Sequence, residues 1–264
     1  MTNETSMTQF YNLSQRYLVV TRSIVCLLAA IICTELWAQT AKQESVHRST
    51  IGYSVLGKPI DCEVHGDGPD VLMVMATIHG NEAAGTPLLA AFSDWLKTHP
   101  EELAGHKVVL IPVANPDGMA SNERFNSRGV DLNRNFPAGN WDESKVNLHG
   151  HAPLSEPESR ALMQAIAHHF PDRIVSIHQP LACVDYDGPA HELAVAMAGD
   201  GPLPVKKLGG LPGSLGSFVG ESMRKPIITW ELPKDAGSDP QQLWNIYGKS
   251  LIAALKFQDP QDGQ

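Results

Sequence analysis

The amino-acid sequence predicts an α/β fold, specifically a three-layer α/β/α sandwich around a mixed, mostly parallel sheet. Short apolar runs typical of buried strands alternate along the chain with stretches in which apolar residues recur near the 3.6-residue helical period. The chain has 264 residues, of which 42% are hydrophobic, and this suffices for one domain with a substantial core. We therefore expect a single folded domain over residues 49–264, preceded by a leader over residues 1–48.

The predicted elements follow one another in a regular order. Strands are predicted for a hairpin over residues 52–65 and then over residues 71–78, 108–113, 173–178 and 226–233. Helices are predicted over residues 87–97, 156–170, 190–197 and 240–255. Before the second helix, Ser155 fits an N-cap and Glu158 its capping-box partner. The Gly- and Asn-rich stretch 115–153 has no such period, and a loop of that length in a compact domain is usually functional.

Residues 1–48 have the features of a secretory signal peptide. Arg16 and Arg22 precede the apolar run 24–33, and residues 36–38 offer a small-residue cleavage site. The run is shorter than the roughly 20 residues that cross a bilayer. We therefore expect export to the periplasm, with no stable membrane insertion once the leader is removed. The alternative is that the first residue of the protein is assigned too early in the sequence, because the leader is long and contains acidic residues.

Charge and cysteine content narrow the class of partner. The formal net charge is −9, and no cluster of Lys and Arg is present, so nucleic acids and anionic membranes have no electrostatic attraction to the chain. A small-molecule substrate is the better expectation. Outside the leader only Cys62 and Cys183 remain, which allows at most one disulfide and does not fit a structural zinc site.

A candidate metal site begins directly after the strand predicted for residues 71–78. His79 and Glu82 have His-x-x-Glu spacing in the loop at the strand's end, where open α/β sheets bind ligands. Zinc accepts imidazole nitrogen and carboxylate oxygen, and a catalytic site uses about three protein ligands. The same spacing at His99 favours a solvated turn, because proline and acidic residues surround it. The candidate third ligand is His178, which ends the strand 173–178.

Two further polar features require an explanation. Glu231 stands near the end of the strand 226–233, where the residues alone leave a catalytic base and a solvated side chain equally open. Residues 129–137 place Asp-x-Asn-Arg-Asn between apolar residues, a pattern that favours binding of a charged ligand.

Taken together, these motifs resemble the zinc carboxypeptidase family over residues 51–257. The matching residues, in chain order, are His79, Glu82, Arg124, Asn133, Arg134, His178 and Glu231. The resemblance implies that one zinc ion per chain is held by the two histidines and Glu82, and that Glu231 is the general base. It also implies that Arg124 stabilises the oxyanion, while Asn133 and Arg134 hold the free carboxylate of the released residue.

Within that family, the segments 115–118, 124–126, 185–190 and 212–217 look most like the murein peptide amidases. This branch hydrolyses the γ-D-glutamyl-meso-diaminopimelate amide bond and releases diaminopimelate. The resemblance therefore implies a murein peptide substrate, a cytoplasmic location as the alternative to the periplasm, and the capacity to form a homodimer. Asp185 or Asp187 could pair with the distal ammonium of diaminopimelate, although Asp-Tyr-Asp-Gly fits a turn equally well.

Two other functions stay open. An N-acylamino-acid deacylase of the aspartoacylase or succinylglutamate desuccinylase type would share the His-x-x-Glu motif and an Asp-x-Asn-Arg segment. A non-catalytic peptidoglycan-binding relative would be expected to have lost a ligand or the base. The resemblance also makes a local structural prediction: relatives have a cis peptide bond where this chain has Gln179-Pro180, so we expect that bond to be cis.

Overall fold

The computed structural model of the protein describes residues 46–258. The predicted leader, residues 1–48, lies almost wholly outside the described residues, so its cleavage and the location of the protein stay predictions. Within residues 46–258, no helix is both long and apolar enough to cross a membrane.

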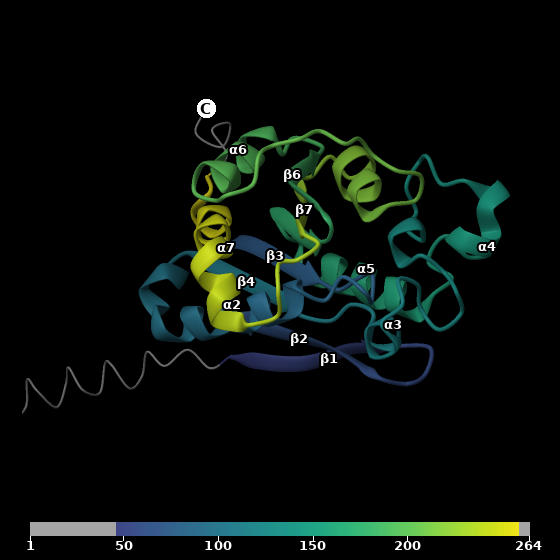
Figure 1. The fold of residues 1–264 in the computed structure, drawn as a ribbon, viewed down its shortest axis with the longest axis horizontal. Helices are drawn as coiled ribbons and strands as arrows, with labels where there is room; N and C mark the ends of the chain where they lie inside the picture. The colour runs from purple at the N-terminus through teal and green to yellow at the C-terminus, as the bar shows by residue number, and fades with distance from the viewer. Residues whose placement is uncertain (1–45, 259–264) are drawn as a thin grey trace, which may run out of the picture. The chain divides into compact units, whose positions relative to one another are not determined.

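A seven-stranded sheet forms the centre of the fold, in the order β1-β2-β4-β3-β5-β7-β6 (Figure 1). Its strands are β1 His47–Tyr53, β2 Pro59–His65, β3 Asp70–Ala76, β4 His106–Ile111, β5 Arg173–His178, β6 Leu181–Asp187 and β7 Ile227–Pro233. The central strands β4, β3, β5 and β7 run parallel. The pairs β1/β2, β2/β4 and β6/β7 are antiparallel, so the predicted mixed sheet is confirmed.

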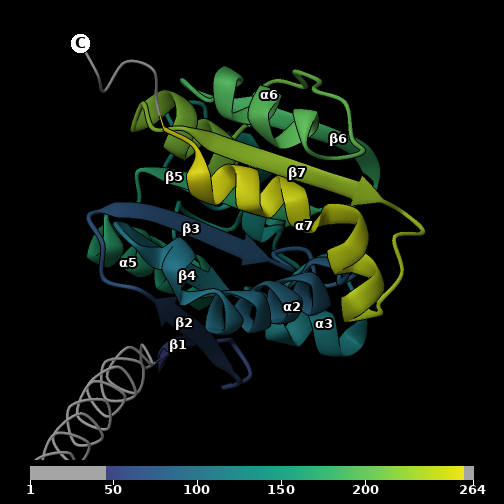
Figure 2. The ribbon, with the colours of Figure 1, turned by 90° about the vertical axis from the view of Figure 1, so that its left-hand side faces the viewer.

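Helices cover both faces of the sheet: in Figure 2, α2 and α7 lie in front of it and α5 lies behind it. The helices are α2 Gly85–Thr98, α3 Pro116–Ser121, α4 Val146–His149, α5 Pro157–His169, α6 His191–Gly199 and α7 Pro240–Lys256. The alternating side chains of β3 divide the core in two. Leu72 and Val74 pack in the cluster that includes α2, α6 and α7, while Val71 and Met73 pack in the cluster that includes α5. The three-layer α/β/α prediction is confirmed.

The start of α5 differs from the sequence prediction. The helix begins at Pro157, and Glu156 occupies the N-cap position without a side-chain cap. Ser155 instead donates to Oε1 of Glu156 at 2.9 Å, and Glu158 accepts a hydrogen bond from the backbone N–H of Val55 at 3.1 Å. The capping-box prediction was wrong because the Glu158 carboxylate is buried and takes its hydrogen-bond donors from distant segments.

The segment that follows His178 also differs from one of the two interpretations of its sequence. Asp185 and Asp187 belong to edge strand β6, and only Gly188, with φ of +63°, begins the turn. The turn alternative for these two aspartates was therefore wrong. The Gln179-Pro180 peptide bond, which precedes β6, is cis as expected.

Candidate active site

The predicted ligands and base meet at the carboxyl ends of the parallel strands. His79 and Glu82 follow β3, and His178 is the last residue of the adjacent strand β5. Glu231 lies beside His178, because these two residues are register partners in the β5/β7 pair. The parallel order of the sheet thus brings residues that are far apart in sequence to one edge, where α/β sheets place their ligands.

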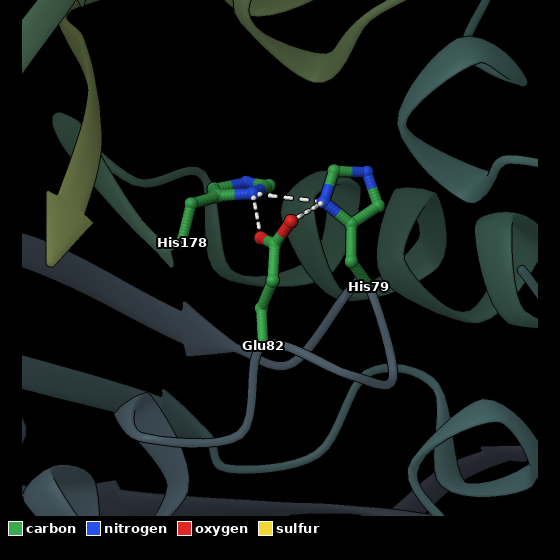
Figure 3. A group of neighbouring side chains, drawn as sticks. All are labelled: His79, Glu82 and His178. Carbon is green, nitrogen blue, oxygen red and sulfur yellow. Dashed lines mark hydrogen bonds and ion pairs between the residues drawn. The ribbon is translucent and has the colours of Figure 1, made fainter. Parts of the chain in front are cut away.

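His79, Glu82 and His178 converge on a common point (Figure 3). Oε1 of Glu82 lies 2.9 Å from Nδ1 of His79, and its Oε2 lies 3.0 Å from Nδ1 of His178. The two Nδ1 atoms are 3.2 Å apart. Tetrahedral zinc with bonds of about 2.0 to 2.2 Å needs donor atoms roughly 3.3 to 3.6 Å apart, so this donor set needs only a slight expansion to fit.

No other group of three or more potential ligands gathers in this way within residues 46–258. The three side chains are also buried, which shields the site from bulk water. Two imidazole nitrogens and one carboxylate are the donors of a catalytic zinc centre that keeps a further position for water. The predicted ligand set therefore fits zinc.

The outer nitrogens of both histidines are held by other side chains. Asp131 lies 3.1 Å from Nε2 of His79, and the hydroxyl of Ser176 lies 3.0 Å from Nε2 of His178. These contacts direct both Nδ1 atoms toward Glu82. Such partners fix the ring orientation and the tautomer of metal-binding histidines.

Asp131 also organises Arg124. Its Oδ2 accepts hydrogen bonds from Nε and Nη2 of Arg124 at 3.1 and 3.0 Å. Burial alone would raise the pKa of Asp131, but the hydrogen bond with His79 and the charges of His79 and Arg124 outweigh it and hold the pKa well below its usual range. Asp131 is thus a buried anion that links the metal site to the predicted oxyanion donor. Sequence reasoning singled out its polar segment but gave Asp131 no role.

Glu231 is buried at the edge of the same site. Its Oε2 accepts a hydrogen bond from the backbone N–H of Leu181 at 3.2 Å. Burial raises the pKa of Glu231 above its ordinary value, although the nearby charge of His178 opposes this. A carboxylate whose pKa is raised toward neutrality is suited to accept a proton and release it again.

The carboxylate clamp implied by the resemblance lies across the site. Asn133 is held by its Oδ1, which accepts from the backbone N–H of Leu215 at 2.9 Å. Arg134 donates to the backbone oxygen of Asn133. Among residues 46–258, no carboxylate lies within ion-pair distance of Arg134, whereas Arg124 pairs with both Asp131 and Glu82. Arg134 therefore has a guanidinium free to bind an anion.

One cavity of about 270 Å³ unites the predicted site. It is lined by all of the residues predicted from the sequence, namely His79, Glu82, Arg124, Asn133, Arg134, His178, Asp185, Asp187 and Glu231. Leu181, Leu208 and Leu211 also line it, and each is about half exposed. The cavity thus combines a metal-binding group, an ionisable base, a free cation and two aspartates beneath a partly apolar rim.

The fold and this His-Glu-His site with its adjacent glutamate define a zinc-dependent hydrolase. The chain belongs to the zinc carboxypeptidase family, whose sequence pattern matches residues 34–184. Murein peptide amidase A of Escherichia coli (strain K12) is 36% identical over 226 residues, which cover 79% of this chain and 88% of that protein. Murein peptide amidase A of Vibrio campbellii is 34% identical over 206 residues, covering 72% of this chain and 78% of that protein.

Solved structures show the same relationship. The murein-tripeptide amidase from Escherichia coli O157 has a TM-score of 0.63 at 28% identity, covering 83% of this chain and 97% of that chain. Carboxypeptidase A from Helicoverpa armigera has a TM-score of 0.67 at 22% identity, covering 83% of this chain and 70% of that chain, and it shares the fold.

Proposed function

We propose that this protein hydrolyses the amide bond between γ-D-glutamate and meso-diaminopimelate in murein peptides and releases free diaminopimelate. The similarity to murein peptide amidases over most of the chain supports this substrate class. The residue that would be released carries a free carboxylate next to the scissile bond, and the site must bind that group. The capacity to form a homodimer stays a prediction.

The observation that carries the proposal is the guanidinium of Arg134 beside the metal-binding residues, which forms no ion pair with any described residue. Arg134 is half-buried, so its charge is partly removed from water, and this burial lowers its pKa. A desolvated arginine without a carboxylate partner is costly unless a ligand supplies the anion. Because the planar guanidinium binds carboxylates with two parallel hydrogen bonds, Arg134 fits the terminal carboxylate of a peptide.

Each residue of the site has its own role in the proposed hydrolysis. His79, Glu82 and His178 would hold a zinc ion, which would supply Lewis acidity toward water and the scissile carbonyl. Glu231 accepts the proton of the attacking water and passes it to the departing amine. Arg124, fixed by Asp131, donates to the carbonyl oxygen as that oxygen gains negative charge.

The direct test is to incubate the purified full chain with L-Ala-γ-D-Glu-meso-diaminopimelate and to measure free diaminopimelate. We expect hydrolysis, complete loss of activity after chelation, and recovery when about one equivalent of zinc per chain is restored. Peptide with an amidated carboxylate on diaminopimelate should be a poor substrate, because Arg134 would lose its partner.

Control substrates separate the alternatives. Hydrolysis of N-acetylamino acids or N-succinylglutamate in place of the tripeptide would show a small-molecule deacylase. Binding of the tripeptide without cleavage by the zinc-loaded protein would show a non-catalytic relative. Activity that persists after the zinc has been removed would contradict the proposed mechanism.

A further inference from the structure

The short segment that follows His178 lies between the proposed metal ligand Glu82 and the proposed base Glu231. The backbone N–H of Gln179 donates to Oε2 of Glu82 at 3.2 Å. The backbone N–H of Leu181 donates to Oε2 of Glu231, also at 3.2 Å. Two main-chain groups of one segment thus contact both carboxylates of the site.

The side chain of Gln179 makes a second pair of contacts, farther along the chain from each carboxylate. Its Oε1 accepts a hydrogen bond from the backbone N–H of Ala84 at 3.1 Å, and its Nε2 donates to the backbone oxygen of Pro233 at 3.0 Å. Ala84 follows Glu82 by two residues, at the start of α2. Pro233 follows Glu231 by two residues and ends β7. In the described part of the chain, no other side chain hydrogen-bonds to both of these segments.

The sheet does not hold these two segments together. Strand β3, which precedes Glu82, and strand β7, which contains Glu231, each pair with β5 and not with each other. Glu82 also lies beyond the end of β3, so its separation from Glu231 depends on contacts outside the strand ladder. A glutamine amide suits this place, because it offers an acceptor to one backbone N–H and a donor to a carbonyl of another segment.

We propose that Gln179 is a positioning residue, whose side-chain amide fixes the metal ligand Glu82 relative to the base Glu231. The amide joins the start of α2 to the end of β7, so its loss lets the two carboxylates shift without removing either one. A misplacement of about 1 Å can lower a rate by about 100-fold. The part of this inference that concerns catalysis rests on the proposed function, whereas the part that concerns metal binding does not.

The first test is Gln179→Met, which keeps the length of the side chain and removes both hydrogen bonds. Its zinc affinity, measured by competition with a chromogenic chelator, should fall on the order of 10-fold. At saturating zinc, kcat for the murein tripeptide should fall on the order of 10- to 100-fold. KM should change little, because neither Asn133 nor Arg134 is held by Gln179.

The matched control is Gln164→Met on the exposed side of α5, which should leave zinc affinity, kcat and KM unchanged. Urea denaturation of both variants would show that they are folded.

A second variant, Gln179→Glu, separates the two hydrogen bonds. A carboxylate still accepts from Ala84 but cannot donate to Pro233, and one of its oxygens would face that carbonyl oxygen. Zinc affinity should be at least that of the wild type, because the contact with α2 is kept and the added negative charge favours a cation. The fall in kcat should be similar to that of Gln179→Met, because the contact with β7 is lost.

The two readouts distinguish this inference from the proposed function. Reduced zinc affinity of Gln179→Met, together with a wild type that does not hydrolyse the tripeptide, would support the positioning of Glu82 and reject the proposed function. The inference would be overturned if folded Gln179→Met kept both its zinc affinity and its kcat. An increase in KM alone would also overturn it and make Gln179 a substrate-binding residue, and wild-type kcat in Gln179→Glu would show that the contact with β7 positions nothing.

Discussion

The carboxylate of Asp131 lies 3.1 Å from Nε2 of His79, on the edge of the imidazole ring opposite to the nitrogen that faces Glu82 and His178. This contact holds His79 with Nδ1 directed into the proposed metal site. Because Asp131 also binds Arg124, one buried anion contacts both a proposed metal ligand and the proposed oxyanion donor. We therefore expect changes at Asp131 to affect both metal binding and catalysis.

Asp131→Asn should weaken zinc binding by about 10- to 100-fold, the usual effect of losing the partner of a metal-bound histidine. The amide keeps the size of the side chain but lacks the charge. Competition with a chromogenic chelator would measure the affinity. Asp142→Asn, on the surface loop before α4, serves as control because its side chain binds only Ser144 and Lys145 among residues 46–258. Unchanged zinc affinity in Asp131→Asn would show that His79 needs no such support.

Glu231→Gln should lower kcat on the order of 10² to 10⁴ while zinc stays bound, because the amide keeps the shape but cannot accept the proton. Elemental analysis of the same preparation would report the zinc content. Glu221→Gln, an equivalent change at an exposed position, should retain wild-type activity. A fully active Glu231→Gln protein would place the base elsewhere.

Arg134→Ala should raise KM for the murein tripeptide on the order of 10- to 100-fold, with a smaller change in kcat, because the clamp binds substrate and transition state alike. The carboxyl-amidated tripeptide should be hydrolysed equally poorly by the variant and the wild type. Arg48→Ala, on edge strand β1, removes the same charge far from the cavity. If the variant still discriminated against the amidated peptide as the wild type does, the clamp would be wrongly assigned.

The positions of the candidate metal ligands and of Glu231 could be predicted from the sequence because each lies at or just beyond the end of a short apolar run. A strand of that kind ends at the carboxyl edge of a parallel sheet, so His178 and Glu231 had to lie near one another once their strands paired. The clamp residues, by contrast, came from the family resemblance. The residues alone marked the segment 129–137 as a candidate for binding a charged ligand, but they did not show that Arg134 forms no ion pair, which depends on the folded chain.

Other features depend on contacts that sequence patterns do not contain. Asp131 meets His79 across 52 positions of the chain, and no local spacing reports that distance. Aspartates alternate with apolar residues in strand β6 because one face of the strand borders the cavity. The Asp-Tyr-Asp-Gly sequence at the end of the strand also fits a turn, so the sequence alone did not separate the two structures. Glu158 was assigned to a cap for a similar reason, because the buried segments that it binds are remote.

Asn126→Ala should lower the free energy of unfolding by about 2 to 4 kcal/mol, because two buried carboxylates lose a donor. Nδ2 of Asn126 lies 2.8 Å from Glu156 and 3.3 Å from Glu158, and Oδ1 accepts from the backbone N–H groups of Arg128 and Val130. Urea denaturation would measure the change. Asn245→Ala, on the exposed side of α7, should cost less than about 0.5 kcal/mol. If Asn126→Ala were as stable as the wild type, Glu156 and Glu158 would have other hydrogen-bond donors.

The stability of the fold should fall as the pH drops through the titration of His169, which ends α5. Burial, together with the charges of His168 and Lys107, lowers the pKa of His169 to about 4. In the unfolded chain this histidine takes up a proton near pH 6.5, whereas in the folded chain it does so only near pH 4. The unfolded state therefore binds more protons between pH 6.5 and pH 4. The contribution of His169 to the free energy of unfolding is complete above pH 6.5 and is lost as the pH falls toward 4.

His169→Gln removes this titration. Urea denaturation of both proteins between pH 7.5 and 4 should show the variant gaining stability relative to the wild type as the pH falls, with most of the gain between about pH 6.5 and 4. The metal ligands are the same in both proteins, so the difference between them isolates His169. A difference in unfolding free energy that stays constant over this range would show that His169 titrates alike in the folded and unfolded chains.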